Sequence, residues 1–455
     1  MQINPHIFRE FSIRGVAEDD LYNEVVICIG RAIGAFFRQR GGRRLVIGRD
    51  VRVSSPRIGR ALIDGLLQSG INVIDLGSVP TPVLNFSTDF YGADGGVMVT
   101  ASHNPPNYNG LKIRAEQTLH GDALQEIYRL AQRDLPPATE TGTRRAVNPL
   151  SDYLHRLRSH AQWAAADCTL KIVVDGGNGA NGRIVSQLLS ALGCEVVELF
   201  CEPDGRFPNR KPDPTAAGAT KPLAAAVLAE NAHLGVAYDG DGDRLAAVDE
   251  QGRTIYGDQL LMLLARDVLH LRPARVVYEV LCSQALADDV RAHGGTPIMT
   301  PSGYAFVHRA MHESGAALGG ELSGHFFFDE PDFRFDDAIL ATLRLLNVVI
   351  QAGRPLSQLV AALPSYHASP EVRLPCPDER KPEVVTRVQQ QYRGRYKVEL
   401  VDGARIHFPQ GWALVRQSNT QPVISMRFEA LTPQHLTAIR TEVQSLVEST
   451  IAEKE

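Results

Sequence analysis

The chain has 455 residues and a formal net charge of −5, and 44% of its residues are hydrophobic. This length predicts roughly three or four domains, and the interspersed charges exclude the basic surface of a nucleic-acid-binding protein. The six cysteines form no CxxC pair, no signal peptide is recognisable, and no apolar run nears the roughly 18 residues of a membrane span, so we expect a cytoplasmic protein with reduced thiols and no membrane partner.

A pattern that occurs three times begins near residue 45: an apolar strand, an amphipathic helix, a glycine that ends the helix and a second apolar strand. The first copy places these parts at residues 45–48, 58–67, 70 and 71–75. A further apolar strand at 96–99 leads into Ser102 and His103. Ser102 is therefore either a displayed nucleophile or an ordinary turn serine. We expect residues 109–112 to turn the chain back and bring Lys112 near the serine hydroxyl.

The second copy places its strand, helix, glycine and strand at residues 170–174, 183–192, 193 and 194–199. A strand at 234–238 then precedes Asp239, Asp241 and Asp243, which alternate with glycines. The glycines let the backbone fold so that three carboxylates point at one hard cation. Three carboxylates leave positions for a phosphate oxygen, which favours Mg²⁺, and Arg244 would face that phosphate or its sugar.

Two alternatives to a magnesium loop remain open. Asp239, Asp241, Asp243 and Glu250 match positions 1, 3, 5 and 12 of a calcium EF-hand, but Arg244 stands where the EF-hand needs glycine. The flanking segments also have the pattern of strands rather than helices. The second alternative is an acidic turn that binds no metal.

The third copy occupies residues 275–278, 283–292, 294–295 and 296–299. The loop at 319–325 then gathers Glu321, Ser323 and His325 between glycines, which suits the vicinal hydroxyls of a sugar. A glutamate at a helix start and a surface histidine would explain these residues equally well.

The three copies predict three related α/β domains in tandem, with mixed, mostly parallel sheets, at residues 1–150, 151–252 and 253–366. Ligands bind beyond the carboxyl ends of parallel strands. The loops that carry Ser102, the three aspartates and Glu321 all follow such strands, so we expect them at equivalent functional positions.

The C-terminal region has a different pattern and predicts a smaller α+β domain at 367–455 that closes a central cleft. It follows a proline-rich linker at 363–377, with helices at 384–391 and 434–451 and strands at 398–401, 405–408 and 423–428. Its most specific motif contains a guanidinium, hydroxyls and an amide that could bind a phosphate dianion. The alternative interpretation is a plain polar turn. The residues are Arg416, Ser418, Asn419 and Thr420.

These four loops, in this order, resemble those of the α-D-phosphohexomutase family, and most closely its bacterial phosphomannomutase/phosphoglucomutase branch. The likeness covers nearly the whole chain and begins at residues 8–15. It implies an enzyme that interconverts hexose 6-phosphate and hexose 1-phosphate, of mannose or glucose, through a phosphoserine and a hexose 1,6-bisphosphate, which is also the activator. One Mg²⁺ per chain and a small phosphosugar partner are implied, and a monomer is the default expectation.

The resemblance also implies a role for each matching residue. Ser102 matches the phosphorylated serine and contributes to the metal site with Asp239, Asp241 and Asp243. Arg14, His103 and Lys112 match basic residues around the phosphoserine that assist catalysis. The implied substrate-binding residues are Arg244, Tyr304, Glu321, Ser323, His325, Arg416, Ser418, Asn419 and Thr420.

Three positions at the implied sugar site depart from the family pattern. Leu281 and Pro301 stand where the branch usually has lysine, and Tyr304 replaces a histidine. The loss of two charged hydrogen bonds would forfeit about 1.5–3 kcal/mol each, so the preferred hexose stays open. Leu322 favours the mannose/glucose branch over glucosamine mutases. Three other hypotheses remain: a glucosamine phosphate mutase, a catalytically weak sugar-phosphate binding protein and a serine phosphohydrolase.

Overall fold

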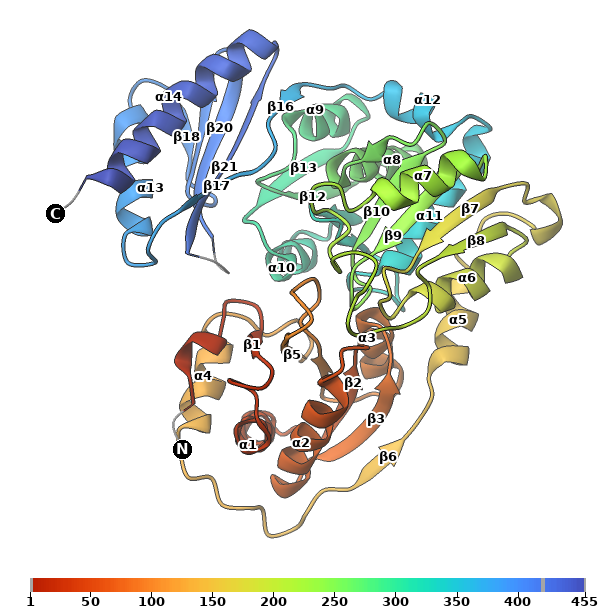
Figure 1. Cartoon of the computed structure of the whole chain (residues 1–455), viewed down its shortest axis with the longest axis vertical. Helices are drawn as coiled ribbons and strands as arrows, with labels where there is room; N and C mark the ends of the chain where they lie inside the picture. Colours follow the sequence, from red (N-terminus) through yellow and green to blue (C-terminus); the bar gives the residue numbers. More distant parts are fainter. Residues whose placement is uncertain (1–2, 419–421, 454–455) are drawn as a thin grey trace. The chain divides into compact units, whose positions relative to one another are not determined.

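The computed structural model describes residues 3–418 and 422–453 (Figure 1). It divides into two compact units, and we describe each by itself. The first comprises Met1–Leu264 and Ser323–Ala361, and the second comprises Ala265–Leu322 and Ala362–Glu455. In the described part of the chain, no helix is long and apolar enough to cross a membrane.

The first unit begins with a six-stranded mixed sheet in the order β1-β5-β4-β2-β3-β6. Strands β4, β2, β3 and β6 are parallel, whereas β5 runs antiparallel to both β4 and β1. The strands are β1 (Ile13–Val16), β2 (Arg44–Arg49), β3 (Asn72–Ser78), β4 (Gly95–Val99), β5 (Tyr108–Arg114) and β6 (Arg144–Ala146). The predicted turn at 109–112 is wrong, because these residues lie in β5. The chain turns earlier, around Asn104–Tyr108, where two backbone hydrogen bonds close the loop.

Helices cover both faces of this sheet. The crossovers from β2 to β3 and from β3 to β4 run in opposite directions, and right-handed crossovers then place α2 and α3 on opposite faces. Helix α1 packs beside α2 (Figure 1). The helices of this part are η1 (Pro5–Ile7), α1 (Asn23–Gln39), α2 (Ser55–Gln68), α3 (Thr81–Phe90), α4 (Asp122–Ala131) and α5 (Leu150–Arg158).

The second sheet repeats this plan with five strands in the order β11-β10-β9-β7-β8. Strands β9, β7 and β8 are parallel, and β10 returns antiparallel beside β9. The elements are η2 (Ala165–Asp167), β7 (Lys171–Asp175), α6 (Gly182–Ala191), β8 (Glu195–Leu199), α7 (Lys221–Ala229), β9 (Leu234–Tyr238), β10 (Leu245–Asp249) and β11 (Thr254–Ile255). The strand, helix and strand expected for this copy are confirmed.

The third copy lies mostly in the second unit, where β13, β12 and β14 form a parallel sheet. Its elements there are β12 (Arg275–Glu279), α9 (Gln284–Ala292), β13 (Thr296–Thr300), α10 (Tyr304–Ser314) and β14 (Leu318–Gly320). Helix α8 (Gly257–Leu271) runs across the division between the units. The first unit holds β15 (Phe326–Phe328), α11 (Ala338–Ala352) and α12 (Leu356–Ala361).

The C-terminal domain is an antiparallel sheet with α13 and α14 on one face (Figure 1). The proline-rich segment is not a plain linker, because β16 and β17 lie within it and pair with β21. Strand β20 was not predicted. The elements are β16 (His367–Ala368), β17 (Val372–Pro375), α13 (Lys381–Tyr392), β18 (Lys397–Glu399), β19 (Ala404–Phe408), β20 (Gly411–Gln417), β21 (Val423–Ala430) and α14 (Pro433–Ala452).

Asp337 caps the N-terminus of α11 and is fully buried. Its carboxylate accepts the N–H groups of Ile339 and Leu340 at 2.8 and 3.0 Å and the Tyr153 hydroxyl at 2.8 Å. Burial raises the pKa of Asp337 to about 6. The pKa of an unfolded aspartate is about 4, so between pH ~4 and ~6 the folded chain holds a proton that the unfolded chain releases. The carboxylate therefore lowers the stability of the folded chain as pH rises through this window.

Asp337→Asn should remove this pH dependence, because asparagine keeps the cap but cannot ionise. Relative to the wild type, the variant should gain stability on the order of 3 kcal/mol between pH 4 and 7. Thermal unfolding midpoints of both proteins, measured across this range, give the difference. Asp152→Asn, an exposed position on α5, is the control and should show no such trend. A midpoint difference for Asp337→Asn that stays constant with pH would contradict the prediction.

Candidate active site

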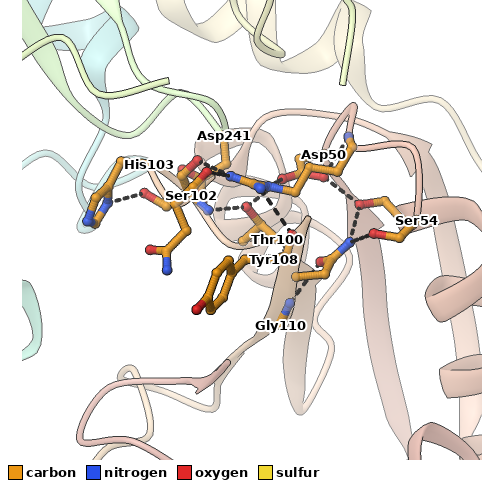
Figure 2. A network of polar contacts seen from close by, with 12 residues as sticks. Asp50, Ser54, Thr100, Ser102, His103, Tyr108, Gly110 and Asp241 are labelled. Atoms are coloured by element: carbon orange, nitrogen blue, oxygen red, sulfur yellow. Dashed lines mark hydrogen bonds and ion pairs between the residues drawn. The ribbon is translucent and has the colours of Figure 1, made fainter. Parts of the chain in front are cut away.

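Ser102 stands at the centre of a buried polar network just after β4 (Figure 2). Its hydroxyl donates a hydrogen bond to Asp239 Oδ2 at 2.7 Å and lies 3.1 Å from His103 Nδ1. Its backbone N–H donates to the Thr100 hydroxyl oxygen at 2.8 Å. The backbone of Ser102 has a φ of 48°, which is a left-handed conformation. This conformation is energetically unfavourable for any residue other than glycine. The loop thus holds this hydroxyl in a fixed, strained position.

The aspartate loop lies between β9 and β10 and points its carboxylates inward. Asp239, Asp241 and Asp243 are at most 1% exposed, and one oxygen from each lies within 4.8 Å of those of the other two. Asp239 Oδ1 accepts three backbone N–H groups, from residues 242, 243 and 244, at 3.0 to 3.2 Å. The loop therefore wraps around one of its own carboxylates.

Lys112, on β5, supplies the positive charge nearest to this cluster. Its ammonium group donates to Asp241 Oδ2 at 2.8 Å and to Asp243 Oδ2 at 2.5 Å. Burial alone would raise the pKa of Asp243, but the charges of Lys112 and His325 together outweigh it and hold that pKa well below its usual value. Burial and the two neighbouring carboxylates raise the pKa of Asp239. Three carboxylates packed this closely repel one another, as the raised pKa of Asp239 indicates, so the loop has the electrostatics of a cation site.

An unsatisfied oxygen supports a metal at this loop. Among the residues that the structure describes, Asp241 Oδ1 is buried without a hydrogen-bond partner, while Asp241 Oδ2 also accepts the Thr81 hydroxyl at 2.8 Å. Carboxylate oxygens without hydrogen donors are the ligands of Mg²⁺ and Ca²⁺. The EF-hand alternative does not fit, because the flanking elements are strands and Glu250 accepts the Ser357 N–H at 3.2 Å and its hydroxyl.

His103 and Arg14 were both expected beside the serine. Burial lowers the pKa of His103 well below its usual value, and the charges of Arg244, Arg14 and Lys112 lower it further. The imidazole is therefore neutral at pH 7 and can accept a proton. Arg14 Nη1 donates to the Asn104 side chain at 2.8 Å, in the loop that carries Ser102. Both residues lie where the sequence placed them, and their catalytic roles stay predictions.

Three of the expected sugar-binding residues belong to the same unit as Ser102. His325 is 2% exposed, with Nε2 at 3.3 Å from Asp243 Oδ1 and 3.8 Å from Asp336 Oδ2. Arg244 Nε lies 3.3 Å from His325 Nε2, and the Ser323 hydroxyl lies 3.3 Å from His325 Nδ1. The alternative of a surface histidine is therefore wrong. The structure brings this part of the sugar loop to the aspartate loop.

Glu321 and Tyr304 lie in the second unit. Glu321 is 3% exposed, and its Oε1 accepts the N–H of Gly303, the residue before Tyr304. Tyr304 begins α10, so this hydrogen bond joins Glu321 to the residue that precedes the second candidate. Pro301 lies just upstream, at the end of β13.

Leu281, where the family pattern has lysine, packs in the second unit against Val280, Trp412 and Leu414. Arg427 donates to its carbonyl oxygen. The residue therefore has an apolar environment that explains leucine at this position without a role in sugar binding.

The expected phosphate-binding loop follows β20, also in the second unit. Arg416 is 6% exposed, and its Nε donates to Asp402 Oδ2 at 2.7 Å. The Ser418 carbonyl accepts from Lys381 Nζ at 2.7 Å. Asn419 and Thr420 lie outside the described residues.

Several polar residues of these loops escaped the sequence analysis. Asp50 and Arg52 directly follow the apolar strand β2, so the rule that led to Ser102 could have found them. Thr81 and Lys381 each begin a helix, and only the folded structure brings them to the aspartate loop and the phosphate loop.

Gly240 permits the close approach of the serine and aspartate loops. A Cβ at this position would lie 2.5 Å from the Ser102 carbonyl oxygen. Gly240→Ala should therefore displace the serine from the carboxylates and lower turnover by about 10²-fold. Gly59→Ala, whose Cβ would meet only Arg49 Cδ at 3.7 Å, is the control and should keep full activity. Steady-state kinetics of both variants test this, and equal activities would contradict it.

The fold and the site together define a class of protein: three related α/β domains and a C-terminal domain, with a buried serine beside three carboxylates. The chain belongs to the phosphoglucomutase/phosphomannomutase family, because the models of all four family domains match it. Domain I matches residues 5–136, domain II 151–252, domain III 256–366 and the C-terminal domain 371–446.

Individual relatives agree with this membership. A phosphomannomutase/phosphoglucomutase of Pseudomonas aeruginosa is 42% identical over 96% of this chain and 94% of its own. A phosphoglucomutase of Neisseria meningitidis is 37% identical over 97% of both chains. The crystal structure of a phosphoglucomutase/phosphomannomutase family protein from Burkholderia thailandensis superposes with a TM-score of 0.90, at 36% identity, over 99% of this chain and 98% of that one.

Proposed function

We propose that this protein is a Mg²⁺-dependent phosphosugar mutase that interconverts hexose 6-phosphate and hexose 1-phosphate, of mannose, glucose or both. The observation that carries the proposal is the hydrogen bond from Ser102 Oγ to Asp239 Oδ2 at 2.7 Å, inside a cluster of three buried carboxylates. A turn serine has no need of such a cluster. A serine that carries phosphate next to a bound cation does.

In this proposal, Ser102 carries the phosphoryl group and transfers it to the free hydroxyl of the hexose phosphate. The other phosphate of the resulting hexose 1,6-bisphosphate then returns to Ser102, and the same bisphosphate activates the resting enzyme. Asp239, Asp241 and Asp243 would hold Mg²⁺, together with an oxygen of phosphorylated Ser102. When bound, Mg²⁺ neutralises charge on the transferred phosphoryl group.

The chain's own groups complete the reaction. Neutral His103 would take the proton of the attacking hydroxyl, since its ring lies beside Ser102 Oγ. Lys112 and Arg14 would add positive charge around the phosphoryl group. The remaining candidates would bind the hexose and its second phosphate: Arg244, Tyr304, Glu321, Ser323, His325, Arg416, Ser418, Asn419 and Thr420.

The domain boundaries 1–150, 151–252, 253–366 and 367–455 belong to the same proposal. The fourth domain would close a central cleft and keep water from the phosphoserine. We further propose a cytoplasmic monomer whose partner is a small phosphosugar. A glucosamine phosphate mutase and a weakly catalytic sugar-phosphate binding protein are the competing functions.

One assay separates these functions. The purified protein is incubated with Mg²⁺, a trace of glucose 1,6-bisphosphate and the phosphates of mannose, glucose or glucosamine. We expect isomer conversion of mannose or glucose phosphate without release of inorganic phosphate. Conversion of glucosamine phosphate alone would select the glucosamine mutase. Absence of conversion with every sugar would refute the mutase, and phosphate release in its place would indicate a hydrolase.

A further inference from the structure

Asp50, which directly follows β2, supports the loop that carries Ser102. It acts indirectly, through hydrogen bonds to residues around the serine, and not through Ser102 Oγ or an aspartate of the loop 239–244. It is 1% exposed, and its Oδ2 accepts the Thr100 hydroxyl at 2.7 Å. Thr100 in turn accepts the Ser102 N–H at 2.8 Å, so a chain of two hydrogen bonds joins the carboxylate to the serine backbone (Figure 2). The other carboxylate oxygen of Asp50, Oδ1, accepts the backbone N–H of Arg52 at 3.0 Å.

Arg52 extends this support to the rest of the loop. Its Nε donates to Asp50 Oδ2 at 3.1 Å, and its side chain is fully buried. Its terminal nitrogens donate to the carbonyl oxygens of Ser102 and Asn104, both at 2.7 Å, and to those of Pro105 and Tyr108 at 2.7 and 3.0 Å. One guanidinium thus binds four carbonyl groups of the loop that displays the serine.

The second domain contains the same arrangement at the equivalent place. Asp175 ends β7, is fully buried, and accepts the N–H two residues later, from Gly177, at 2.8 Å. Arg210 Nε donates to Asp175 Oδ2 at 2.8 Å, and its Nη2 donates to the Tyr238 carbonyl at 2.7 Å. Tyr238 immediately precedes the aspartate loop. A buried carboxylate and an arginine again support the loop that leaves the neighbouring strand.

The third domain achieves this support without an arginine. Glu279 ends β12, is 1% exposed, and its longer side chain reaches the neighbouring loop directly. Its Oε1 accepts the Leu322 N–H at 2.8 Å, one residue after Glu321. Burial, followed by the charge of Glu321, raises the pKa of Glu279 to about 8.

We propose that Asp50, Asp175 and Glu279 are equivalent positioning residues, each of which fixes the functional loop of its own domain. Each stands at the carboxyl end of a central parallel strand, and the loop it holds leaves the adjacent strand: β4 beside β2, β9 beside β7 and β14 beside β12. A buried carboxylate is costly unless hydrogen bonds and opposite charges compensate. Here the compensating donors include groups of the loops themselves or an arginine that binds them.

The kinetic consequences of this inference rest on the proposed function, because that function gives each of the three loops a different role in the reaction. Asp50 would control the position of the phosphoryl-carrying serine, Asp175 the metal site and Glu279 the hexose contact. Displacement of a reacting group by about 1 Å costs about 10²-fold in rate. Three loss-of-support variants should therefore alter three different parameters.

The experiment compares Arg52→Lys, Arg210→Lys and Glu279→Leu, in which leucine removes the oxygen that accepts the Leu322 N–H. Lysine keeps the positive charge but cannot bind the carboxylate and the carbonyls together. Arg52→Lys should lower kcat by about 10²-fold and leave KM within about twofold. Arg210→Lys should weaken metal binding by about 10-fold, measured by calorimetry without substrate and with Mn²⁺ as the probe in place of Mg²⁺. Glu279→Leu should raise KM for the hexose phosphate by about 10-fold and leave Mn²⁺ binding unchanged.

Two controls remove similar arginines that support no such loop. Arg114 pairs with Asp89, and Arg266 pairs with Asp289. Arg114→Lys and Arg266→Lys should leave kcat, KM and Mn²⁺ binding unchanged. If Arg52→Lys does not fold, Thr100→Val removes only the hydroxyl between Asp50 and Ser102 and should lower kcat alone. Variants that all change the same parameters, or that change none, would overturn the proposal.

Hydrogen exchange decides the proposal independently of turnover. Each variant should raise amide exchange in its own loop, at residues 100–105, 239–244 or 321–325, and leave the other two loops unchanged. If the wild type converts no hexose phosphate, the proposed function fails, but this pattern would still support the three positioning residues. Unchanged exchange in all three loops, or a uniform increase, would refute them.

Discussion

Ser102→Ala should lower kcat for hexose phosphate conversion by on the order of 10⁴-fold or more. The alanine variant has no oxygen to carry the phosphoryl group, and the neighbouring polar groups cannot replace a nucleophile. Its KM should change little, because the groups proposed to hold the hexose and its second phosphate remain. The wild type should also gain the mass of one phosphate after incubation with glucose 1,6-bisphosphate, whereas Ser102→Ala should not.

Ser54→Ala is the matched control for this prediction. Ser54 lies in the same polar network (Figure 2), but its hydroxyl contacts the Asn109 side chain at 2.8 Å rather than a carboxylate of the aspartate loop. This variant should keep both turnover and phosphorylation. More than about 1% residual activity in Ser102→Ala would show that another group carries the phosphate and would remove the basis of the proposed mechanism.

The repeat explains why so much of the first three domains could be predicted from the sequence. Parallel strands buried on both faces give continuous apolar runs, and β2, β7 and β12 all match such runs. Because ligand loops follow the carboxyl ends of these strands, the pattern also located Ser102 and the aspartates.

Two of the errors lie where strands are short or polar. Strand β5 contains Asn109, Gly110 and Lys112, whose composition resembles a turn, and it is a strand because it pairs with β1 and β4. Strand β17 has an alternating pattern of exposure and ends in Pro375, so only its pairing with β21 reveals it. These segments are strands because they pair with segments that are distant in the sequence. The local pattern of residues carries no information about such pairing.

The same reason limits what the sequence could reveal of the site. Thr81 meets Asp241 across 160 positions of the chain. Leu281 departs from a family pattern of lysine, and its apolar partner Trp412 lies in another domain. The sequence could therefore identify the loops, while the contacts through which distant residues support each loop required the folded structure.

Asp241→Asn tests the metal site with the smallest change of shape. Among the described residues, Asp241 Oδ1 is one of the buried carboxylate oxygens of this loop without a hydrogen-bond partner, so it would gain from a cation. The amide removes one negative charge while Lys112 keeps its bond to Asp243. Mg²⁺ binding should weaken by at least about 100-fold. Turnover at a fixed Mg²⁺ concentration should fall on the order of 10³-fold, and excess Mg²⁺ should restore it in part.

Glu250→Gln is the control, because it separates the magnesium loop from an EF-hand. An EF-hand needs a bidentate glutamate at this position, twelfth from Asp239. Here Glu250 accepts from Ser357 instead, so its amide variant should bind Mg²⁺ and turn over like the wild type. Calorimetry with Mg²⁺ and with Ca²⁺ distinguishes the two cases. Loss of metal binding in Glu250→Gln, with binding retained in Asp241→Asn, would reverse the assignment, because the loop would then coordinate its ion from the opposite end.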